Sequence, residues 1–222
     1  MSFDFPFMLQ VFFVALGAVP LSLGIAFFAL IVGMILGTII ALIRFYRVPF
    51  FSVLCKGIIT IIQGIPVILL YLSFFLLFMS TPNIPSAAVA SLALILPATA
   101  RISEVIRGAL QSISRSQFDA AYAIGHTEKA LFFRIILPQL IPVSIPLIGN
   151  VSIQMIKAVP IATLIGVNDI LNTALLEATV NYRYLESYIA AGLIFWGLFI
   201  IIENFFSRIE KHFNNQMRRR EA

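Results

Sequence analysis

The chain has 222 residues, of which 60% are hydrophobic and only 11% are charged, and its mean hydropathy is +1.01. A water-soluble domain needs more charge to solvate its surface, so this composition excludes a soluble globular protein and indicates a membrane protein with room for about four to six spans. The net charge of +5 does not indicate a nucleic-acid partner, because Lys and Arg stand between and after the apolar runs and form no basic, aromatic-interleaved patch.

Long apolar runs dominate the first part of the chain. Residues 5–17 form a Phe-rich lead-in, which we expect to be a helix at the membrane interface. Residues 18–43 are the first predicted span and residues 51–79 are the second. The second run is too long for one straight crossing and contains Gly64 and Pro66, so it predicts a kinked or tilted helix.

The rest of the chain predicts three further spans around one polar stretch. In order, the segments are the third span at 87–107, the polar stretch at 108–138, the fourth span at 139–159, a re-entrant turn with a surface helix at 160–186, the fifth span at 187–206 and a basic tail at 207–222. The predicted fold is an all-α integral membrane bundle of about five transmembrane helices, with residues 1–222 forming a single domain.

The distribution of basic residues predicts the orientation of this bundle. Cytoplasmic loops of membrane proteins carry an excess of Lys and Arg. Thirteen of the fifteen Lys and Arg residues fall after the first span, in or beside the polar stretch, or in the tail, and only Lys157 and Arg183 fall elsewhere. We therefore expect the polar stretch and the C-terminus to be cytoplasmic and the N-terminus to lie outside.

Two short helices joined at a glycine are predicted within the polar stretch. Phe118, Ala121 and Tyr122 recur at helical spacing and give the first helix one apolar stripe. Gly125 can adopt a positive φ and end this helix without a Cβ clash. Asp119 is expected near the start of the same helix, where the helix dipole favours a carboxylate.

The second of these helices is predicted to begin at Thr127, with Glu128 in its first turn. Its apolar face consists of Leu131, Phe132, Ile135 and Ile136. Pro138 is expected to mark the point where the chain turns back into the membrane. A protruding helical pair with one apolar face and a charged rim suits docking into a groove on a soluble partner.

The same stretch resembles the EAA signature of bacterial ABC importer permeases. The resemblance rests on a run "D-A-A-x-x-x-G" followed by "I-L-P", which comprises Asp119, Ala120, Ala121, Gly125, Ile136, Leu137 and Pro138. The runs "SEVIRGALQSISRSQFDAA" at 103–121, "PLIGN" with Lys157, and "QGIPVILLY" are similar to runs in the polar amino-acid branch of that family. Departures from the family pattern are Gln63 for Arg, Arg101 for an aromatic residue, Ser116 for Gly, and "KAVPIATL" for Lys-Asp-Thr-Ser-Leu.

This resemblance implies a fold, a function and a set of partners. The fold would be that of an ABC type I importer permease, with the 108–138 stretch serving as its coupling-helix loop. The chain would carry a polar L-amino acid such as cystine, arginine, histidine or glutamine across a bacterial cytoplasmic membrane. Its partners would be a cytoplasmic ABC ATPase dimer, a second permease copy or paralogue, an extracellular or periplasmic amino-acid-binding protein and the membrane lipid, with no nucleic acid.

Enzyme motifs do not occur in the sequence. There is no G-x-x-x-x-G-K-[ST] loop for ATP, and neither H-E-x-x-H nor G-x-S-x-G is present. We therefore expect no catalytic residue, metal or cofactor in this chain, and ATP and Mg²⁺ would bind the partner ATPase. A secondary active transporter without an ATPase is the alternative, but it needs an inverted repeat, which the sequence does not contain. A membrane-embedded enzyme is a third possibility, and the missing motifs argue against it.

Polar residues within the apolar runs are candidates for the solute path, because ionisable groups at membrane depth are costly without a partner or water. Glu104 has Arg101 and Arg107 at i−3 and i+3, so it either lines the path or belongs to an intrahelical charge ladder. Gln63 lies beside the predicted kink, where helix packing is the competing explanation. Glu203 is expected to pair with cations of the tail.

The fourth predicted span carries a polar stripe. Asn150, Gln154 and Lys157 share one helix face and could line a cavity that meets a carboxylate. Lys157 is expected near the outer end of the span, where it could instead extend its amine to the lipid headgroups. Both readings of Lys157 stay open at this point.

Overall fold

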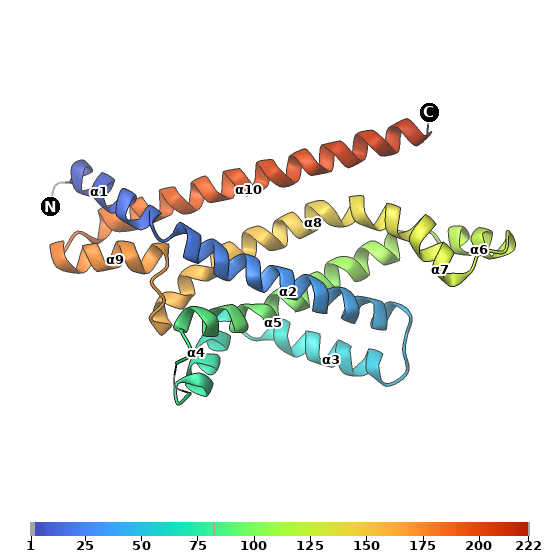
Figure 1. Ribbon diagram of the computed structural model, residues 1–222, viewed down its shortest axis with the longest axis horizontal. Helices are drawn as coiled ribbons and strands as arrows, with labels where there is room; N and C mark the ends of the chain where they lie inside the picture. The colour runs from blue at the N-terminus through green and yellow to red at the C-terminus, as the bar shows by residue number, and fades with distance from the viewer. Residues whose placement is uncertain (1–2, 82, 222) are drawn as a thin grey trace.

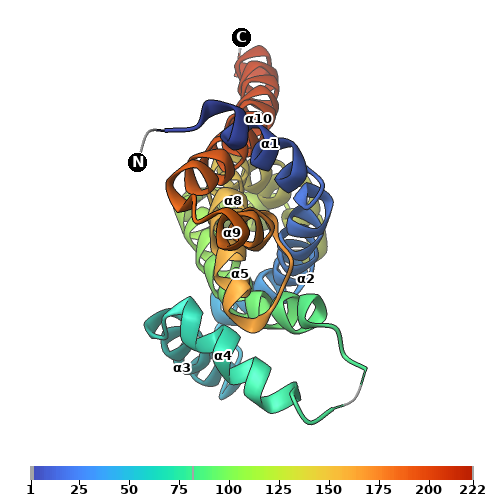
Figure 2. The same ribbon diagram turned by 90° about the vertical axis from the view of Figure 1, so that its left-hand side faces the viewer.

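The computed structural model describes the backbone of residues 3–81 and 83–221, and the side chains as far as residue 213. All regular elements in these ranges are helices, as predicted. Figures 1 and 2 show an elongated bundle in which most helices run along the long axis. Four described helices are long and apolar enough to cross a membrane, and a bent pair raises this number to five.

The first two helices are α1 (Phe5–Leu16) and α2 (Val19–Phe45). Asp4 begins α1, because its side chain accepts a hydrogen bond of 3.0 Å from the Phe7 amide. Helix α1 packs on α10 and α9, and α2 lies where the first span was predicted. The lead-in is therefore a helix held against the rest of the bundle.

The closest helix contact in the bundle joins α2 to α5 (Ser86–Ser112), and small residues permit it. A Cβ atom built on Gly33 would lie 2.7 Å from the Cβ of Ala98, and one built on Gly37 would lie 2.8 Å from the carbonyl oxygen of Thr99. Helices in membranes pack closely where glycine and alanine let their backbones approach. Both glycines are therefore required by the packing of this pair.

The bend predicted within residues 51–79 is confirmed beside Gly64 and Pro66, but it separates two helices and is not a kink within one. Helix α3 (Phe51–Gly64) and helix α4 (Val67–Phe78) are bent by 101°. The residue before a proline is pushed out of the α region, and Ile65, with ψ at 125°, is extended in this way before Pro66. The hydroxyl of the fully buried Tyr71 donates to the Ala158 carbonyl at 3.3 Å and holds α4 against the end of α8.

The polar stretch contains α6 (Arg115–Ala123), α7 (Glu128–Leu131) and a π-helical turn η1 (Phe132–Ile136), and it leads into α8 (Leu137–Ala158). The prediction that the chain turns at Pro138 is wrong, because α7, η1 and α8 form one continuous span. Pro138 lies at the start of α8, directly after the π turn, where the altered hydrogen-bond pattern accommodates its missing N–H.

The last elements are a 3₁₀ helix η2 (Val159–Ile165), helix α9 (Ile170–Asn181) and helix α10 (Tyr184–Glu221). The tail is not separate from the fifth span, because α10 continues through the predicted 207–222 segment without a break. No Gly or Pro interrupts the sequence after Gly197, so nothing local ends the helix.

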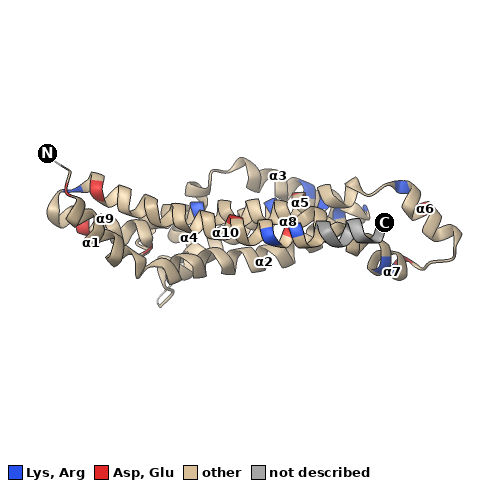
Figure 3. Ribbon diagram, turned by 90° about the horizontal axis from the view of Figure 1, so that it is seen from above, with Lys and Arg blue, Asp and Glu red and all other residues tan. Residues whose placement is uncertain are grey.

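The bundle has two distinct ends. Helices α1 and α9 lie at one end, which we call the α9 end, and helices α6 and α7 lie at the other, which we call the loop end (Figure 1). Figure 3 shows most blue Lys and Arg ribbon segments in the half of the molecule that leads to α6 and α7.

Candidate functional site: the α6–α7 loop and the adjoining cavity

Helix α6 begins at Ser114, whose hydroxyl accepts a hydrogen bond of 3.3 Å from the Ser116 amide. Asp119 is the fifth residue of this helix, so its expected place in the first turn is wrong. Ser112, Ser114 and Ser116 precede Asp119, and the cap forms at Ser114, five residues before it. Asp119 is instead exposed, together with Ala120, while Ala121 is buried.

A glycine turn ends α6 as predicted. Gly125 has φ at +79°, in the left-handed region. Its amide donates to the Tyr122 carbonyl at 3.0 Å, and the His126 amide donates to the Ala121 carbonyl at 3.0 Å. These two bonds form a Schellman motif, in which the left-handed residue is usually glycine. A side chain at Gly125 would meet no atom within 4 Å, so its backbone conformation alone requires glycine.

Helix α7 begins at Thr127 as predicted, since the Thr127 hydroxyl accepts from the Ala130 amide at 3.3 Å. Leu131 and Ile136 are each 1% exposed, which confirms the predicted apolar face. Leu137 packs against the same core from the first turn of α8. Helix α7 is joined to α8 through the π-helical turn η1 within one continuous helical segment.

The loop is also tied to the bundle through α6. The side-chain amide of Gln139 on α8 donates to the Gln117 oxygen on α6 at 2.6 Å. Ile113, in the short link from α5 to α6, is buried in the main core. The ring of Phe118 lies 6.3 Å from the ring of Phe45 at the end of α2. Helix α6 therefore contacts α2 and α8, and it joins α5 directly.

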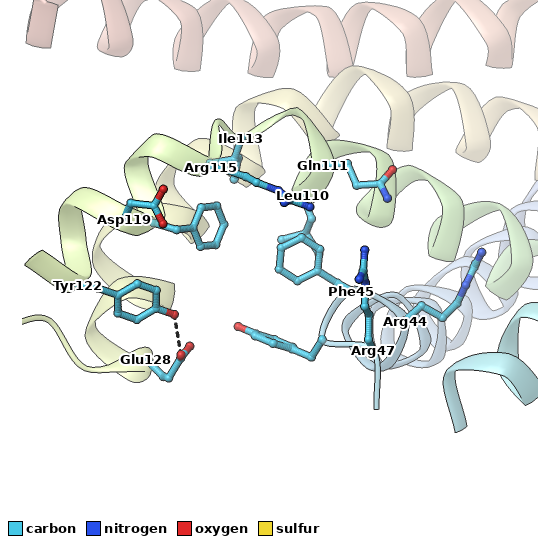
Figure 4. A pocket seen from close by; sticks show the side chains of 12 residues that line it. Arg44, Phe45, Arg47, Leu110, Gln111, Ile113, Arg115, Asp119, Tyr122 and Glu128 are labelled. Atoms are coloured by element: carbon cyan, nitrogen blue, oxygen red, sulfur yellow. Dashed lines mark hydrogen bonds between the residues drawn. The ribbon is translucent and has the colours of Figure 1, made fainter. Parts of the chain in front are cut away.

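A cavity of about 470 Å³ lies between this loop and the end of α2 (Figure 4). Its walls come from α2 and the residues after it, the end of α5, and the α6–α7 loop, and they comprise Arg44, Phe45, Tyr46, Arg47, Leu110, Gln111, Ile113, Arg115, Phe118, Asp119, Tyr122 and Glu128. In Figure 4 the side chains of Asp119, Tyr122 and Glu128 lie on one side of this space and those of Phe45 and Arg47 lie on the other, while the Arg44 side chain points away from it.

Glu128, in the wall of this cavity, interacts with two tyrosines. The Tyr122 hydroxyl donates to its carboxylate at 2.6 Å, and this bond raises the pKa of Tyr122. The pKa of Tyr46 is raised by partial burial and by the same carboxylate. Tyr122 was predicted to belong to the apolar stripe, but its hydroxyl instead joins α6 to the first turn of α7.

Glu104 forms ion pairs with two arginines near the cavity. Its carboxylate lies 2.5 Å from Arg107, one helical turn away, and 2.5 Å from Arg44 on α2. The predicted charge ladder paired Glu104 with Arg101 and Arg107. Arg107 does pair with it, but Arg101 is exposed, and Arg44 of α2 is the second partner. Arg44 is 60 residues from Glu104 in sequence, and no local pattern connects them.

We expect Glu104→Gln to destabilise the α2–α5 pair. Removing the carboxylate leaves the Arg44 side chain, which is 10% exposed, without its anion. Loss of a charge-assisted hydrogen bond costs about 1.5–3 kcal/mol, or about 3–12 °C in melting temperature for a chain of this size. Thermal unfolding of the detergent-solubilised protein measures this change. Arg101→Gln is the matched control, and an equal loss in both variants would contradict a specific role for the Arg44–Glu104 pair.

The structure does not bring the five predicted solute-path residues together. Gln63 is exposed at the end of α3, and Glu104 is held by the two arginines. Asn150 and Gln154 are exposed on α8. No hydrogen bond or ion pair connects any two of the five within the described part of the chain.

Lys157 lies in the last turn of α8, near the end of the fourth predicted span, as expected. Its amine lies 5.1 Å from the centre of the Phe199 ring on α10. It therefore contacts an aromatic ring in the groove between α8 and α10.

Glu203 has no described ion pair, so its expected pairing with Arg208 or Lys211 is not found. The remaining tail cations lie outside the described side chains. In the described residues no group of three or more His, Cys, Asp and Glu side chains could hold a metal ion.

The fold and the site together define a class of protein. The chain is a multi-span helical bundle with a capped helix–glycine–helix loop that projects from one end and is continuous with the spans. This combination is that of a membrane transport component with the ABC type I importer permease fold.

The chain belongs to the family of binding-protein-dependent transport system inner membrane components, whose sequence profile matches residues 33–215. It is 32% identical over 209 residues to a probable amino-acid ABC transporter permease protein, PatM, of Vibrio harveyi, covering 91% of this chain and 92% of PatM. It is 31% identical to the L-cystine transport system permease protein TcyL of Bacillus subtilis, with 90% and 87% of the two chains covered.

Solved structures have the same fold. An amino acid ABC transporter crystallised with histidines matches with a TM-score of 0.87 and 27% identity, covering 96% of this chain and 100% of that chain. The inward-facing MetNI methionine ABC transporter matches with a TM-score of 0.75 at 17% identity, over 95% and 99% of the chains, which supports the fold alone. These findings confirm the predicted fold class and the family resemblance.

Proposed function

We propose that this chain is the membrane-spanning subunit of an ABC importer for a polar L-amino acid, driven by a separate ATPase that docks on the α6–α7 loop. The observation that carries the proposal is the loop itself, which is capped at both helices, closed by a left-handed glycine and continuous with α8. The names of the relatives support amino acids as the solute class, with cystine, arginine, histidine and glutamine as the compounds to test.

The loop residues would act in two ways. Asp119 and Ala120 are exposed on α6 and would contact the ATPase, whereas Ala121 is buried and fixes the helix on the bundle. Ile136 and Leu137 anchor the other side of the loop in the core, and Pro138 follows the π turn. Movement of the ATPases would then pass directly to α5 and α8. ATP and Mg²⁺ would bind the ATPase, and this chain would hold no cofactor.

The concentration of basic residues near the loop end supports a cytoplasmic location for α6 and α7 in a bacterial cytoplasmic membrane. In this orientation the N-terminus and the α9 end lie outside, where an extracellular or periplasmic binding protein would deliver the solute. The exposed Asn150 and Gln154 on α8 would line the solute path, and Glu104 would stand at its cytoplasmic end.

The experiment that tests the proposal is co-purification of the tagged chain with its ATPase, followed by uptake of radiolabelled amino acids into proteoliposomes with the binding protein present. We expect uptake to require ATP and to persist when ion gradients are dissipated. Uptake that follows an ion gradient without ATP would instead establish a secondary transporter.

Gln154→Leu tests the proposed path. We expect uptake to fall by about tenfold, because the substitution removes a polar side chain that would contact the solute during translocation. ATPase co-purification should not change, since Gln154 lies on α8 far from α6 and α7. Ile141→Leu on another face of α8 is the control. Unchanged uptake in Gln154→Leu would remove this residue from the path.

A further inference from the structure

The cavity between the α6–α7 loop and the end of α2 carries charges of both signs on its walls. Arg47 and Arg115 supply two exposed guanidinium groups, and Asp119 and Glu128 supply two exposed carboxylates. In Figure 4 both carboxylates lie on the loop side, Arg47 lies on the opposite side, and the Arg115 side chain extends away from Asp119. The cavity therefore has a negative wall and a positive wall.

These opposite charges do not pair with one another. The two arginines and the two acids form no ion pair within the described part of the chain. Arg115 and Asp119 are four residues apart on α6, a spacing at which oppositely charged side chains commonly interact. The Glu128 carboxylate instead accepts a hydrogen bond from the Tyr122 hydroxyl at 2.6 Å. Both signs of charge are thus left to a ligand.

The backbone of Arg47 is strained where it meets this cavity. Its φ is +52°, in the left-handed region, which favours glycine and is costly for a residue with a side chain. Strain of this kind is concentrated at functional sites, where the surrounding structure maintains it. The neighbouring Phe45 packs against the main core and contacts the Phe118 ring, so the end of α2 is fixed to both the bundle and the loop. The Arg47 charge is therefore held at a defined place.

The size and lining of the cavity suit a small molecule. Its volume of about 470 Å³ lies in the range of about 300–1,000 Å³ that is usual for ligand pockets. Phe45, Leu110 and Phe118 form an apolar part of the lining. The Gln111 oxygen accepts from Arg107 at 2.8 Å, which leaves the amide N–H groups of Gln111 to donate to a ligand.

A ligand with a single sign of charge does not fit these walls, because an anion would face the two carboxylates and a cation would face the two arginines. We propose that the cavity binds a small zwitterion, with its carboxylate or phosphate on Arg47 and Arg115 and its primary ammonium on Glu128. Arginine binds both kinds of acid through paired N–H donors, and a carboxylate accepts the N–H groups of an ammonium. Free amino acids and the phosphoethanolamine headgroup of a membrane lipid share this chemistry.

The inference goes beyond the proposed function, because it assigns a ligand to the loop end, whereas the proposed solute path follows α8. A bound zwitterion would link the α6–α7 loop to the end of α2, in addition to the contact between Phe118 and Phe45. Binding can be measured on the full chain without the ATPase, the binding protein or transport. Either proposal can therefore fail while the other holds.

The first test measures binding of two probes to the full chain purified in detergent, by isothermal titration calorimetry. L-Glutamine represents the free amino acids, and O-phosphoethanolamine represents the lipid headgroup. We expect at least one probe to bind, and Arg47→Gln and Glu128→Gln should each weaken its binding by at least about tenfold, because each removes a charge-assisted hydrogen bond. Arg134→Gln and Glu203→Gln remove the same charges at exposed positions outside the cavity, so they should leave binding unchanged.

Ligand analogues test whether both charges are needed. N-Acetyl-L-glutamine lacks the ammonium, L-glutamine amide lacks the carboxylate, and phosphocholine has methyl groups in place of the ammonium N–H donors. Each should bind at least about tenfold more weakly than its parent probe. Binding of L-glutamine alone assigns the site to free amino acids, and binding of O-phosphoethanolamine alone assigns it to lipid headgroups.

Three results would overturn the proposal. These are no binding of either probe, equal binding of the probes and their analogues, and binding that survives both cavity substitutions. The last result would place the zwitterion elsewhere in the chain, for example in the solute path.

A second measurement needs no substitution and covers the event that the variants alter the loop. Phenylglyoxal modifies exposed arginines, and mass spectrometry of the natural chain shows which of them have reacted. Saturating L-glutamine or O-phosphoethanolamine should slow the modification of Arg47 and Arg115 and leave that of the exposed Arg101 and Arg134 unchanged. Equal rates at Arg47 and Arg115 with and without both probes would contradict the proposed contacts.

Discussion

Gly125→Val is expected to leave the permease inserted in the membrane but to reduce ATP-driven uptake by about tenfold or more. Gly125 has φ at +79°, where an L-residue is strained by about 1–2 kcal/mol and a β-branched residue by more. The two hydrogen bonds that end α6 depend on this conformation. A valine would open the turn and redirect α7 relative to α6. ATPase co-purification and uptake in proteoliposomes measure the loss.

Two variants serve as controls for this substitution. Gly125→Asn should retain most of the uptake, because asparagine tolerates the left-handed region better than other residues with a side chain. Gly108→Val introduces the same side chain at an exposed glycine within α5, where a Cβ would meet nothing within 4 Å. If Gly125→Val keeps both the ATPase and uptake at the level of Gly108→Val, the α6–α7 loop is not the coupling element.

Gly37→Leu is expected to destabilise the whole bundle, because it separates α2 from α5. A Cβ on Gly37 would lie 2.8 Å from the Thr99 carbonyl oxygen and 2.9 Å from the Ile102 side chain, closer than real Cβ atoms approach. Overpacking by even a few carbons costs about 1–3 kcal/mol, and here the nearest obstacle is helix backbone, which cannot rotate away. We expect a lower yield of monodisperse protein and a melting temperature lower by about 5 °C or more.

Gly24→Leu is the matched control, since it adds the same side chain to the same helix at a position with nothing within 4 Å. Size-exclusion profiles and thermal unfolding in detergent compare the two variants. Equal behaviour of the two would show that the α2–α5 contact tolerates a larger residue and is not the tightest part of the bundle.

The loop is the part of the candidate site for which sequence reasoning worked best. The helix caps and the apolar face of the loop depend on residues within one or two helical turns, namely Thr127, Gly125, Leu131 and Ile136. Residue type and spacing are therefore enough to predict them. Asp119 shows the limit of that reasoning, because Ser112, Ser114 and Ser116 upstream also offer caps and the sequence does not rank them. The helix begins at Ser114, and Asp119 lies in its second turn.

The cavity could not have been predicted from sequence. Arg44 lies at the end of α2 and Tyr46 directly after it, and both reach the loop only because α2 packs closely on α5. The pairing of Arg44 with Glu104 has the same origin, and it displaces Arg101, which helical spacing alone favoured. Sequence contains no signal for which of two arginines lies within reach of a carboxylate across a helix pair.

The sequence by itself determined the membrane class, the all-α fold, the family and the two capped helices of the loop, because hydropathy, helix caps and glycine conformation are local properties of the chain. Only the tertiary structure decided the 101° break between α3 and α4, the continuity of α7 with α8 past Pro138, and the contact of Lys157 with the Phe199 ring. Each of these depends on which helices lie side by side and at what depth. Proline and glycine mark where a helix can bend, but packing against neighbouring helices decides whether it does and in which direction.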